Sequence, residues 1–250
     1  MSTTLITGAS SGLGAEMARQ LAARGHDLAL CARRTDRLTE LATEITTAHP
    51  DRRVVVKALD VTDHDAVFRV FDEFHDELGG IDRVIVNAGL GKGAPIGTGR
   101  YDANKQTAMT NFVAALAQTE AAMEIFRAQK RGHLVMISSV SAMRGMRKTV
   151  TTYAATKAGV ATLAEGLRNE MLGEPDLDIR VSTIYPGYIR SEMNERVKKT
   201  PFIVDTQPGV RAMVEAIEKE RANALVPAWP WLPLGQAMRH LPLPLVRKIM

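Results

Sequence analysis

Three glycines close to the start of the chain constrain its fold more than any other feature. They lie in the stretch Thr7-Gly8-Ala9-Ser10-Ser11-Gly12-Leu13-Gly14, between a short apolar run at 3–6 and a helix-like segment at 15–24. In a strand, glycine turn and helix of this kind, the backbone of the turn can approach a phosphate group closely. The first turn of the helix adds unpaired N–H groups and the positive end of the helix dipole. The stretch predicts a cradle for the pyrophosphate of a dinucleotide, and a glycine turn without a ligand is the alternative.

Apolar strand-like runs alternate with helix-like patterns along the chain. Long crossovers between strands indicate a parallel sheet with helices on both faces. Consecutive apolar residues, as at 54–56 and 84–86, are typical of strands covered on both faces. Because no Ser/Gly-rich linker and no repeat is found, we expect one α/β domain, a doubly wound Rossmann-type parallel sheet of about seven strands. The predicted strands are 3–7, 27–32, 53–59, 81–87, 132–138, 178–185 and 224–227, and the predicted helices are 13–24, 35–48, 63–78, 102–130, 152–172 and 208–221.

Composition and charge exclude several other classes of protein. A hydrophobic content of 45% and a charged content of 24% in 250 residues argue for a large core and against global disorder. A single cysteine, Cys31, cannot form an internal disulfide, so we expect a reducing, cytoplasmic location, and we expect neither a signal peptide nor a membrane span. The net charge of +4 resides at the C-terminal end, because residues 1–220 hold 28 basic and 28 acidic side chains. A neutral body argues against nucleic acid as a partner.

The second predicted strand ends in Arg33 and Arg34. An acidic residue at this place would accept hydrogen bonds from the ribose hydroxyls of NAD, whereas a guanidinium matches a 2′-phosphate in charge and in geometry. The pair therefore favours NADP over NAD. A solvated arginine pair at the start of a helix is the alternative.

Polar and small residues also end the third and fourth predicted strands. Asp60 follows the third strand and is placed to accept a hydrogen bond from an adenine amino group, or else Asp60 or Thr62 caps the next helix. Asn87-Ala88-Gly89 follows the fourth strand, where small residues would let a cofactor lie against the sheet edge and Asn87 would tie neighbouring strands together. A loop-forming Asn-x-Gly turn explains that stretch equally well.

A possible catalytic group follows the fifth predicted strand. Ser139 stands at the strand end, and a later helix carries Tyr153 and Lys157, whose i, i+4 spacing places both on one face. A tyrosine titrates near pH 10, and a nearby ammonium lowers that pKa. Ser139 is suited to bind a carbonyl oxygen on which negative charge develops. Asn111, a polar residue on an apolar helix face, needs buried partners; local backbone or water bonding is its simpler explanation.

Taken together, these motifs make the chain resemble the short-chain dehydrogenases/reductases from about Thr3 to Ser191. The resemblance implies NAD(P)-dependent chemistry between alcohols and carbonyls. It implies that Tyr153 is the general acid/base, that Ser139 orients the carbonyl, that Lys157 binds ribose and lowers the tyrosine pKa, and that Asn111 holds a water in a proton relay. The motifs that carry it are Thr7-Gly8-x3-Gly12-x-Gly14, Asp60-Val61, Asn87-Ala88-Gly89, Asn111, Ser139, Tyr153-x3-Lys157 and Pro186-Gly187.

The cofactor-binding residues expected on this basis come from six places in the chain. Pro186-Gly187-Tyr188-Ile189 would face the nicotinamide, with Ser191 where the family often has threonine. The full expected set is Gly8, Ser10, Ser11, Gly12, Leu13, Gly14, Arg33, Arg34, Asp60, Val61, Asn87, Ala88, Gly89, Tyr153, Lys157, Pro186, Gly187, Ile189 and Ser191.

One spacing departs from the family pattern. The catalytic serine usually precedes the tyrosine by thirteen residues, and that position is Val140 here. Ser139 lies one residue farther from Tyr153, and Ser141 lies one residue nearer. The Ile-Ser-Ser strand ending favours Ser139, with a one-residue insertion in the loop at 143–150, and Ser141 is the alternative.

The C-terminal part has an unusual composition. We take residues 1–226 as the dinucleotide-binding and catalytic part and 227–250 as a Pro/Trp-rich basic amphipathic extension of the same domain. The extension holds five of the eleven prolines, both tryptophans, and no acidic residue. It is suited to packing within the protein, to contact in a homo-oligomer, to closing the active site, or to peripheral membrane contact. The resemblance implies that the charged segment at 190–199 belongs to a flap over the substrate, and a solvated helix is the alternative. The apolar residues Met193, Phe202 and Ile203 suggest an apolar substrate, although packing is their commoner role.

The sequence predicts an NADP(H)-dependent oxidoreductase acting on an apolar, lipid-, steroid- or keto-acyl-like carbonyl or alcohol. A catalytically silent NADP(H)-binding sensor or scaffold is the alternative. Such a protein would not need the Tyr153–Lys157 pair.

Overall fold

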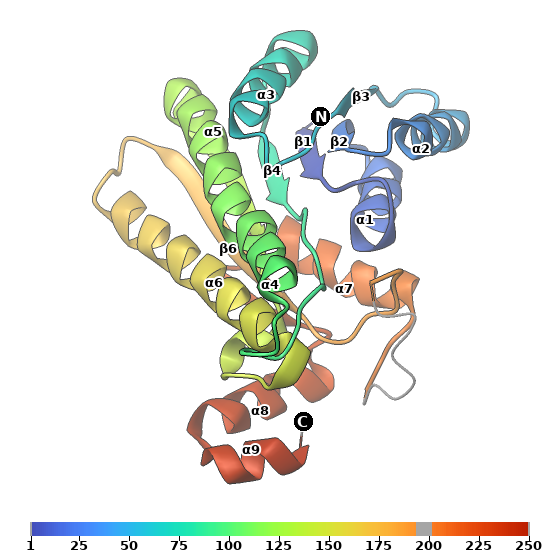
Figure 1. Ribbon diagram of the computed structural model, residues 1–250. Coiled ribbons are helices and arrows are strands. Elements are labelled where there is room, and N and C mark those ends of the chain that lie inside the picture. Colours follow the sequence, from blue (N-terminus) through green and yellow to red (C-terminus); the bar gives the residue numbers. More distant parts are fainter. Residues whose placement is uncertain (1, 194–201, 250) are drawn as a thin grey trace.

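The computed structural model describes residues 2–193 and 202–249. Seven parallel strands form one sheet in the order β3-β2-β1-β4-β5-β6-β7 (Figure 1). The predicted α/β class and the seven-stranded parallel sheet are therefore confirmed. The strands are β1 (Thr3–Thr7), β2 (Asp27–Ala32), β3 (Val54–Ala58), β4 (Arg83–Val86), β5 (Arg131–Ile137), β6 (Asp178–Pro186) and β7 (Asn223–Val226).

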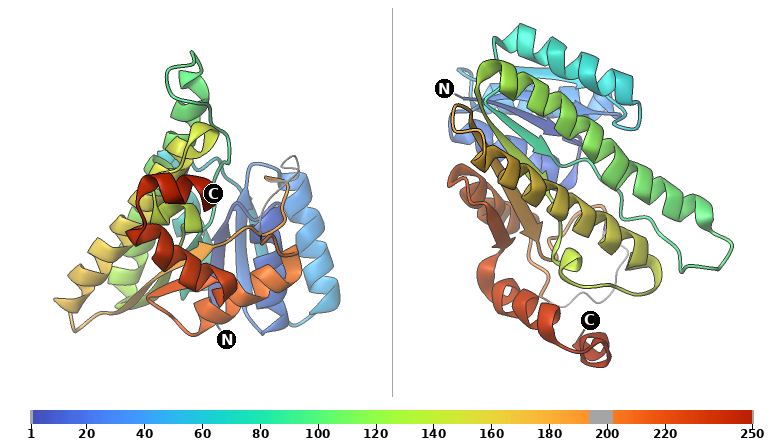
Figure 2. Two further views of the ribbon diagram at one scale, coloured as in Figure 1. Left: turned by 90° about the horizontal axis from the view of Figure 1, so that it is seen from below. Right: turned by 90° about the vertical axis from the view of Figure 1, so that its left-hand side faces the viewer.

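Helices cover both faces of the sheet, as the two views in Figure 2 show. Neighbouring strand residues point to opposite faces: Leu5 packs in the core under one layer of helices and Ile6 in the core under the other. One layer holds α3 (His64–Leu78), α5 (Ala114–Gln129) and α6 (Thr151–Leu172), and the other holds α1 (Gly12–Ala23), α2 (Thr35–Ala48) and α7 (Thr206–Glu218).

Two local predictions were wrong in detail. The expected helix at 102–130 is divided into α4 (Tyr101–Ala108), a π-helical turn (Met109–Val113) and α5. In addition, neither Asp60 nor Thr62 caps α3. The cap is Asp63, whose side chain accepts a hydrogen bond from the backbone N–H of Ala66 at 3.1 Å, because the Asp60 carboxylate is already bonded to the backbone N–H and hydroxyl of Thr62.

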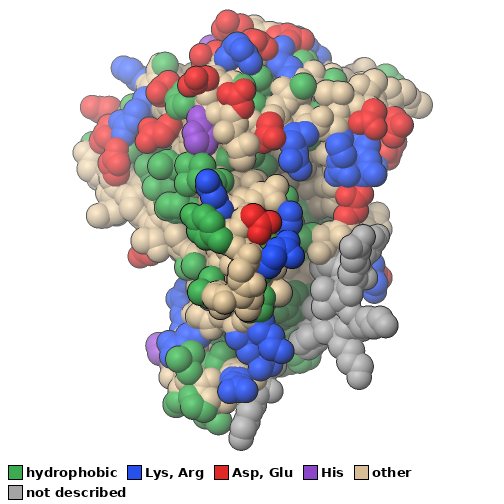
Figure 3. Space-filling view, viewed as in Figure 1, with side chains coloured by type: hydrophobic (Ala, Val, Ile, Leu, Met, Phe, Trp, Pro, Cys, Tyr) green, Lys and Arg blue, Asp and Glu red, His purple; other side chains and the backbone are tan. Residues whose placement is uncertain are grey.

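The C-terminal extension forms α8 (Ala228–His240) and α9 (Leu243–Ile249), which protrude at one end of the molecule (Figure 1). Trp231 is fully buried, so this part of the extension packs within the protein. Trp229 (79% exposed) and Leu243 (58% exposed) remain at the surface. Basic and hydrophobic groups gather at this end in Figure 3. Contact with a membrane and contact in a homo-oligomer stay predictions. Among the described helices, none is long and apolar enough to cross a bilayer.

Candidate active site

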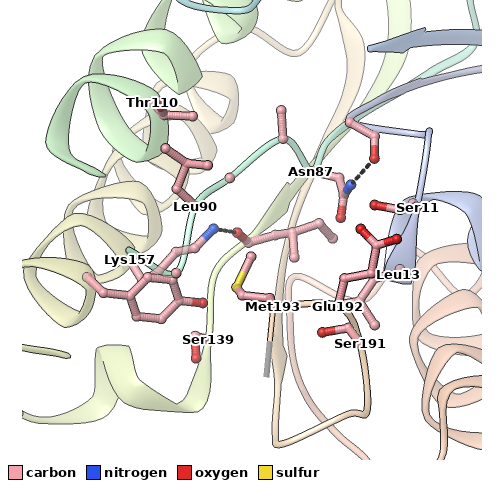
Figure 4. Close-up of a pocket in the computed structure, with 18 of the residues that line it drawn as sticks. Ser11, Leu13, Asn87, Leu90, Thr110, Ser139, Lys157, Ser191, Glu192 and Met193 are labelled. Carbon is pink, nitrogen blue, oxygen red and sulfur yellow. Dashed lines mark hydrogen bonds between the residues drawn. The ribbon is translucent and has the colours of Figure 1, made fainter. Parts of the chain in front are cut away.

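A cavity of 680 Å³ opens at the carboxyl ends of the strands, where the strand order reverses between β1 and β4. This switch point is where open α/β sheets bind ligands. Every predicted cofactor-binding residue lines the cavity, and so does Ser139; Figure 4 shows part of this lining. Asn111 is absent from the lining and lies directly behind it. The structure thus brings together predicted residues from seven separate parts of the chain, at 8–14, 33–34, 60–61, 87–89, 139, 153–157 and 186–191.

The glycine turn is shaped for close approach of its backbone to a ligand. Gly8 and Gly12 have φ values of 65° and 55°, in the left-handed region that glycine adopts without strain. A Cβ on Gly14 would lie 2.5 Å from the carbonyl oxygen of Gly8 and 2.8 Å from Nδ2 of Asn87. The turn therefore leaves no room for a side chain at Gly8 or Gly14. Ser11 stands at the N-terminus of α1 without a side-chain cap.

Asn87 ties β4 to β1, as one of its two sequence interpretations predicted. Its side-chain Nδ2 donates to the carbonyl oxygen of Thr7 at 2.9 Å. In return, Oγ1 of Thr7 accepts from the backbone N–H groups of Asn87 and Ala88, both at 3.1 Å. These bonds hold the end of β4 against the glycine turn and so fix the wall of the cavity.

Arg34 reaches the glycine turn, whereas Arg33 is more exposed. Nη2 of Arg34 donates to the hydroxyl of Ser11 at 2.5 Å, and Nε donates to the hydroxyl of Ser10 at 3.3 Å. Arg33 lies 3.9 Å from a carboxylate oxygen of Asp60. Both guanidinium groups therefore stand at the end of the cavity where the sequence predicted a 2′-phosphate, with Asp60 beside them.

Lys157 is buried at the opposite end of the cavity. Its Nζ donates a hydrogen bond to the carbonyl oxygen of Ile137 at 2.7 Å and lies 5.9 Å from the ring centre of Tyr153. A Cβ on Gly89 would lie 3.6 Å from this Nζ and 3.3 Å from Oδ1 of Asn111, so a small residue at 89 keeps the lysine head accessible.

The pKa values of Tyr153 and Lys157 differ from the expectation that the ammonium lowers the pKa of the tyrosine. Burial raises the pKa of Tyr153, and a hydrogen bond with Ser139 acts in the opposite direction. Burial lowers the pKa of Lys157 to about 8. The expected lowering of the tyrosine pKa by Lys157 is not found in the protein alone, because desolvation is the larger effect and the ammonium is engaged by the carbonyl of Ile137.

Asn111 bridges the π-helical turn to the loop after β4. Oδ1 accepts from the backbone N–H of Leu90 at 2.7 Å, and Nδ2 donates to the carbonyl oxygen of Leu90 at 2.9 Å. Its Nδ2 also lies 3.4 Å from Oγ1 of Thr156, on α6 beside Lys157. The bonds are thus to backbone distant in sequence, and the relay role implied by the resemblance stays a prediction.

Ser139 and Ser141 both line the cavity and contact each other. Oγ of Ser139 accepts hydrogen bonds from the backbone N–H of Ser141 at 3.2 Å and from its hydroxyl at 3.0 Å. Ser141 is buried, whereas Ser139 is partly exposed and is hydrogen-bonded to Tyr153. This arrangement favours Ser139 as the residue that meets a substrate, with Ser141 orienting it.

Sequence reasoning missed three residues of this region. Arg37 and Glu192 form an ion pair next to Arg34, and Trp231 packs its indole against Gly187 so closely that no Cβ would fit there. Arg37 was detectable, because a residue three positions after Arg34 on a helix lies close to it. No local signal indicated the other two, since each contact joins segments far apart in the sequence.

The fold and the cavity define an α/β protein of the dinucleotide-binding class, and the comparisons with known proteins specify the family. The family model described as short chain dehydrogenase matches residues 2–201. An uncharacterized oxidoreductase of Mycobacterium tuberculosis (strain CDC 1551 / Oshkosh) is 55% identical over 244 residues, which are 98% of this chain and 95% of the relative. The chain belongs to the short-chain dehydrogenase/reductase family and is an oxidoreductase of that family.

Two solved structures share both fold and recognisable sequence. A short-chain dehydrogenase from Sphingobium yanoikuyae in complex with NADPH has a TM-score of 0.81 at 28% identity, with 97% of each chain covered. The bulky-bulky ketone specific alcohol dehydrogenase from Comamonas testosteroni has a TM-score of 0.79 at 28% identity, covering 97% of this chain and 96% of that one.

Proposed function

We propose that the protein is an NADP(H)-dependent oxidoreductase that transfers a hydride between nicotinamide and a carbonyl or secondary alcohol of an apolar substrate. The observation that carries this proposal is the placement of Tyr153, Ser139 and Lys157 in one cavity with the glycine turn. A glycine turn alone would support binding without chemistry. The added acid/base side chain and its neighbours support turnover rather than a silent sensor or scaffold.

The residues present suit an NADP(H) molecule. The side-chain-free cradle at Gly8 and Gly14 would receive the pyrophosphate at the N-terminus of α1. Arg34 and Arg33 would hold the 2′-phosphate, because no acidic residue ends β2 and because guanidinium groups bind phosphate oxygens well. Pro186, Gly187, Ile189 and Ser191 line the part of the cavity proposed for the nicotinamide. When bound, the cofactor supplies or accepts the hydride.

Tyr153 is the proposed general acid and base. In the direction of reduction its hydroxyl donates a proton to the carbonyl oxygen while the carbonyl carbon accepts the hydride; in the direction of oxidation it takes that proton back. Ser139 donates a second hydrogen bond to the same oxygen and so stabilises the negative charge that develops on it. The Ser141 hydroxyl orients Ser139 for this task.

Lys157 and Asn111 are proposed to support the tyrosine. Lys157 would bind ribose hydroxyls and, as an ammonium close to the phenolate, would favour the ionised tyrosine. Asn111, fixed by both polar groups of Leu90, would hold a water that links Lys157 to solvent. Through Lys157 and this water, a proton from solvent can then replace the one that Tyr153 gives up.

The substrate end of the cavity supports an apolar substrate. Leu90, Val150, Tyr188 and Met193 line it, and Val150 and Met193 are 38% and 55% exposed there. Burial of such side chains against a substrate stabilises the complex in proportion to the apolar area covered. The likeness to the bulky-bulky ketone specific alcohol dehydrogenase supports the same proposal. A cytoplasmic location and a homo-oligomeric state remain part of the proposal.

The direct test is NADPH oxidation by the purified protein with a panel of bulky aryl and steroid-like ketones, followed at the absorbance of reduced nicotinamide. We expect turnover with at least one bulky ketone and a kcat/KM at least about tenfold higher with NADPH than with NADH, because an arginine–phosphate contact is a charge-assisted pair. Binding of NADPH without turnover of any ketone or alcohol would favour the sensor.

A further inference from the structure

The chain between β6 and α7 is held in place just before Glu192. Ile189 and Val204 form a short parallel bridge, in which the backbone N–H of Arg190 donates to the carbonyl oxygen of Val204 at 2.9 Å. The hydroxyl of Thr206 donates to the carbonyl oxygen of Arg190 at 2.8 Å. These bonds fix the point from which Ser191 and Glu192 enter the cavity lining.

Glu192 extends from this point to the two arginines at the proposed phosphate end. One carboxylate oxygen lies 2.5 Å from Nη1 of Arg37, and the other lies 3.2 Å from Nη1 of Arg34. Figure 4 shows the Glu192 side chain in the same part of the cavity as Ser11 and Leu13. A single carboxylate thus bridges two guanidinium groups, one of which also bonds both serines of the glycine turn.

The electrostatics of this cluster are consistent with a charged carboxylate at neutral pH. The hydrogen bond from Arg37 lowers the pKa of Glu192 below its ordinary value, and that from Arg34 adds to the effect. Three other acidic groups lie in this region. The charges of Asp36 and Glu40 act on Arg37, and Asp60 stands beside Arg33. None of these three lies within ion-pair distance of Arg34 or Arg37, and among the described residues Glu192 is the anion that this pair contacts.

We propose that Glu192 is a determinant of cofactor selectivity, because its carboxylate occupies the Arg34–Arg37 pair that the 2′-phosphate of NADP(H) would take. This inference rests on the proposed NADP(H) function and deepens it. Arg37 thereby becomes a third arginine of the proposed phosphate site, in addition to Arg33 and Arg34. The 2′-phosphate must displace the carboxylate before it can bind both arginines.

The exchange affects NADP(H) and not NAD(H), because only NADP(H) carries a 2′-phosphate. A phosphate monoester carries a charge of about −1.5 to −2 at neutral pH and offers three acceptor oxygens, so it replaces a carboxylate on two arginines favourably. NAD(H) has no group that can make this exchange and leaves the ion pairs intact. Glu192 therefore reduces the affinity for NADP(H) without a matching effect on NAD(H).

The test is isothermal titration calorimetry of the free protein with NADP⁺ and with NAD⁺, which differ only in the 2′-phosphate. We expect Glu192→Gln to strengthen NADP⁺ binding roughly three- to tenfold and to change NAD⁺ binding less than about twofold, as befits loss of an exposed ion pair that competes with the ligand. Glu44→Gln is the matched control. It removes the same charge from an exposed carboxylate that pairs with Arg19, away from the cavity.

Two further variants test the role of Arg37. Arg37→Gln should weaken NADP⁺ binding and leave NAD⁺ binding unchanged, and Glu192→Gln should have a smaller effect on NADP⁺ binding when Arg37 is already replaced. If the wild-type protein prefers NADP⁺ and Glu192→Gln leaves this preference unchanged, the inference alone is contradicted. If Glu192→Gln weakens NAD⁺ binding, Glu192 is a ribose ligand and the inference is wrong. A wild-type protein without any preference for NADP⁺ would contradict the proposed cofactor itself.

Discussion

Lys157 donates a hydrogen bond from Nζ to the carbonyl oxygen of Ile137 at 2.7 Å, across the junction between α6 and the end of β5. The next residue, Ser138, returns a bond from its hydroxyl to the carbonyl oxygen of Lys157 at 2.8 Å. The two bonds hold the helix that carries Tyr153 and Lys157 against the end of β5, two residues before Ser139. These bonds explain how an ammonium group is kept buried beside the cavity.

This burial predicts a pH dependence of stability. The pKa of Lys157 is about 8 in the folded protein, against an ordinary value of 10.5. Between these values the unfolded chain keeps a proton that the folded protein has lost, so the free energy of unfolding rises with pH. We therefore expect the free energy of unfolding of the wild type to rise relative to that of Lys157→Met between about pH 8 and about pH 10, as measured by urea unfolding. A difference that stays constant would show that the lysine titrates normally in the fold.

The assignment of the catalytic serine can be decided by two substitutions. Ser139→Ala removes the hydrogen bond to the developing negative charge and should lower kcat roughly 10²-fold. Ser141→Ala removes only a bond that orients Ser139, which is worth about 1 kcal/mol, or roughly fivefold in rate. Steady-state kinetics with the best ketone compare the two. The reverse order of effects would transfer the role to Ser141.

The extension acts on the cavity through Trp231 and Gly187. Because the indole fills the space beside Gly187, Gly187→Ala should destabilise the protein by about 1–3 kcal/mol through overpacking. Gly166→Ala is the control, since nothing lies within 4 Å of a Cβ at that exposed helical position and alanine should stabilise the helix by about 0.5–1 kcal/mol. Thermal or urea unfolding measures both. If both variants had the same free energy of unfolding, the close contact between Trp231 and Gly187 would be refuted.

Membrane contact of the extension is better tested by surface substitutions than by deletion. Deletion of residues 228–250 would remove the buried Trp231, so surface substitutions are preferable. Trp229 and Leu243 are exposed, and the extension at 227–250 carries no acidic residue. If the extension binds membranes, wild type should co-sediment with phosphatidylserine vesicles and Trp229→Ser/Leu243→Ser should not. Absence of the wild type from the vesicle pellet would end the membrane prediction.

Most of the fold could be predicted from the sequence, because strand apolarity and helix periodicity are local signals. The runs at 3–7 and 27–32 became β1 and β2 with the same bounds. The π-helical turn could not be predicted, since no local signal marks it and its residue Asn111 bonds to Leu90 in the loop after β4, far away in the sequence. Whether a helix continues or is interrupted there is decided by tertiary contacts, which periodicity does not report.

In the candidate site too, residues of local motifs could be predicted, and residues placed by tertiary contacts could not. Gly8, Asn87, Tyr153 and Lys157 belong to short motifs with fixed spacing, and the structure places them together in one cavity. Glu192 lies more than 150 residues from Arg37, with which it pairs. Its carboxylate resembles any other surface charge in the sequence, so only the structure shows its position at the proposed phosphate end.

The central claim is that Tyr153 is the proton donor and acceptor of an NADP(H)-dependent reaction. The most direct measurement combines steady-state ketone reduction with calorimetric NADP⁺ binding for Tyr153→Phe. We predict a loss of kcat of about 10²- to 10⁴-fold with NADP⁺ affinity unchanged within about threefold, because the substitution removes only the hydroxyl. Retention of kcat within about tenfold of the wild-type value would contradict the claim.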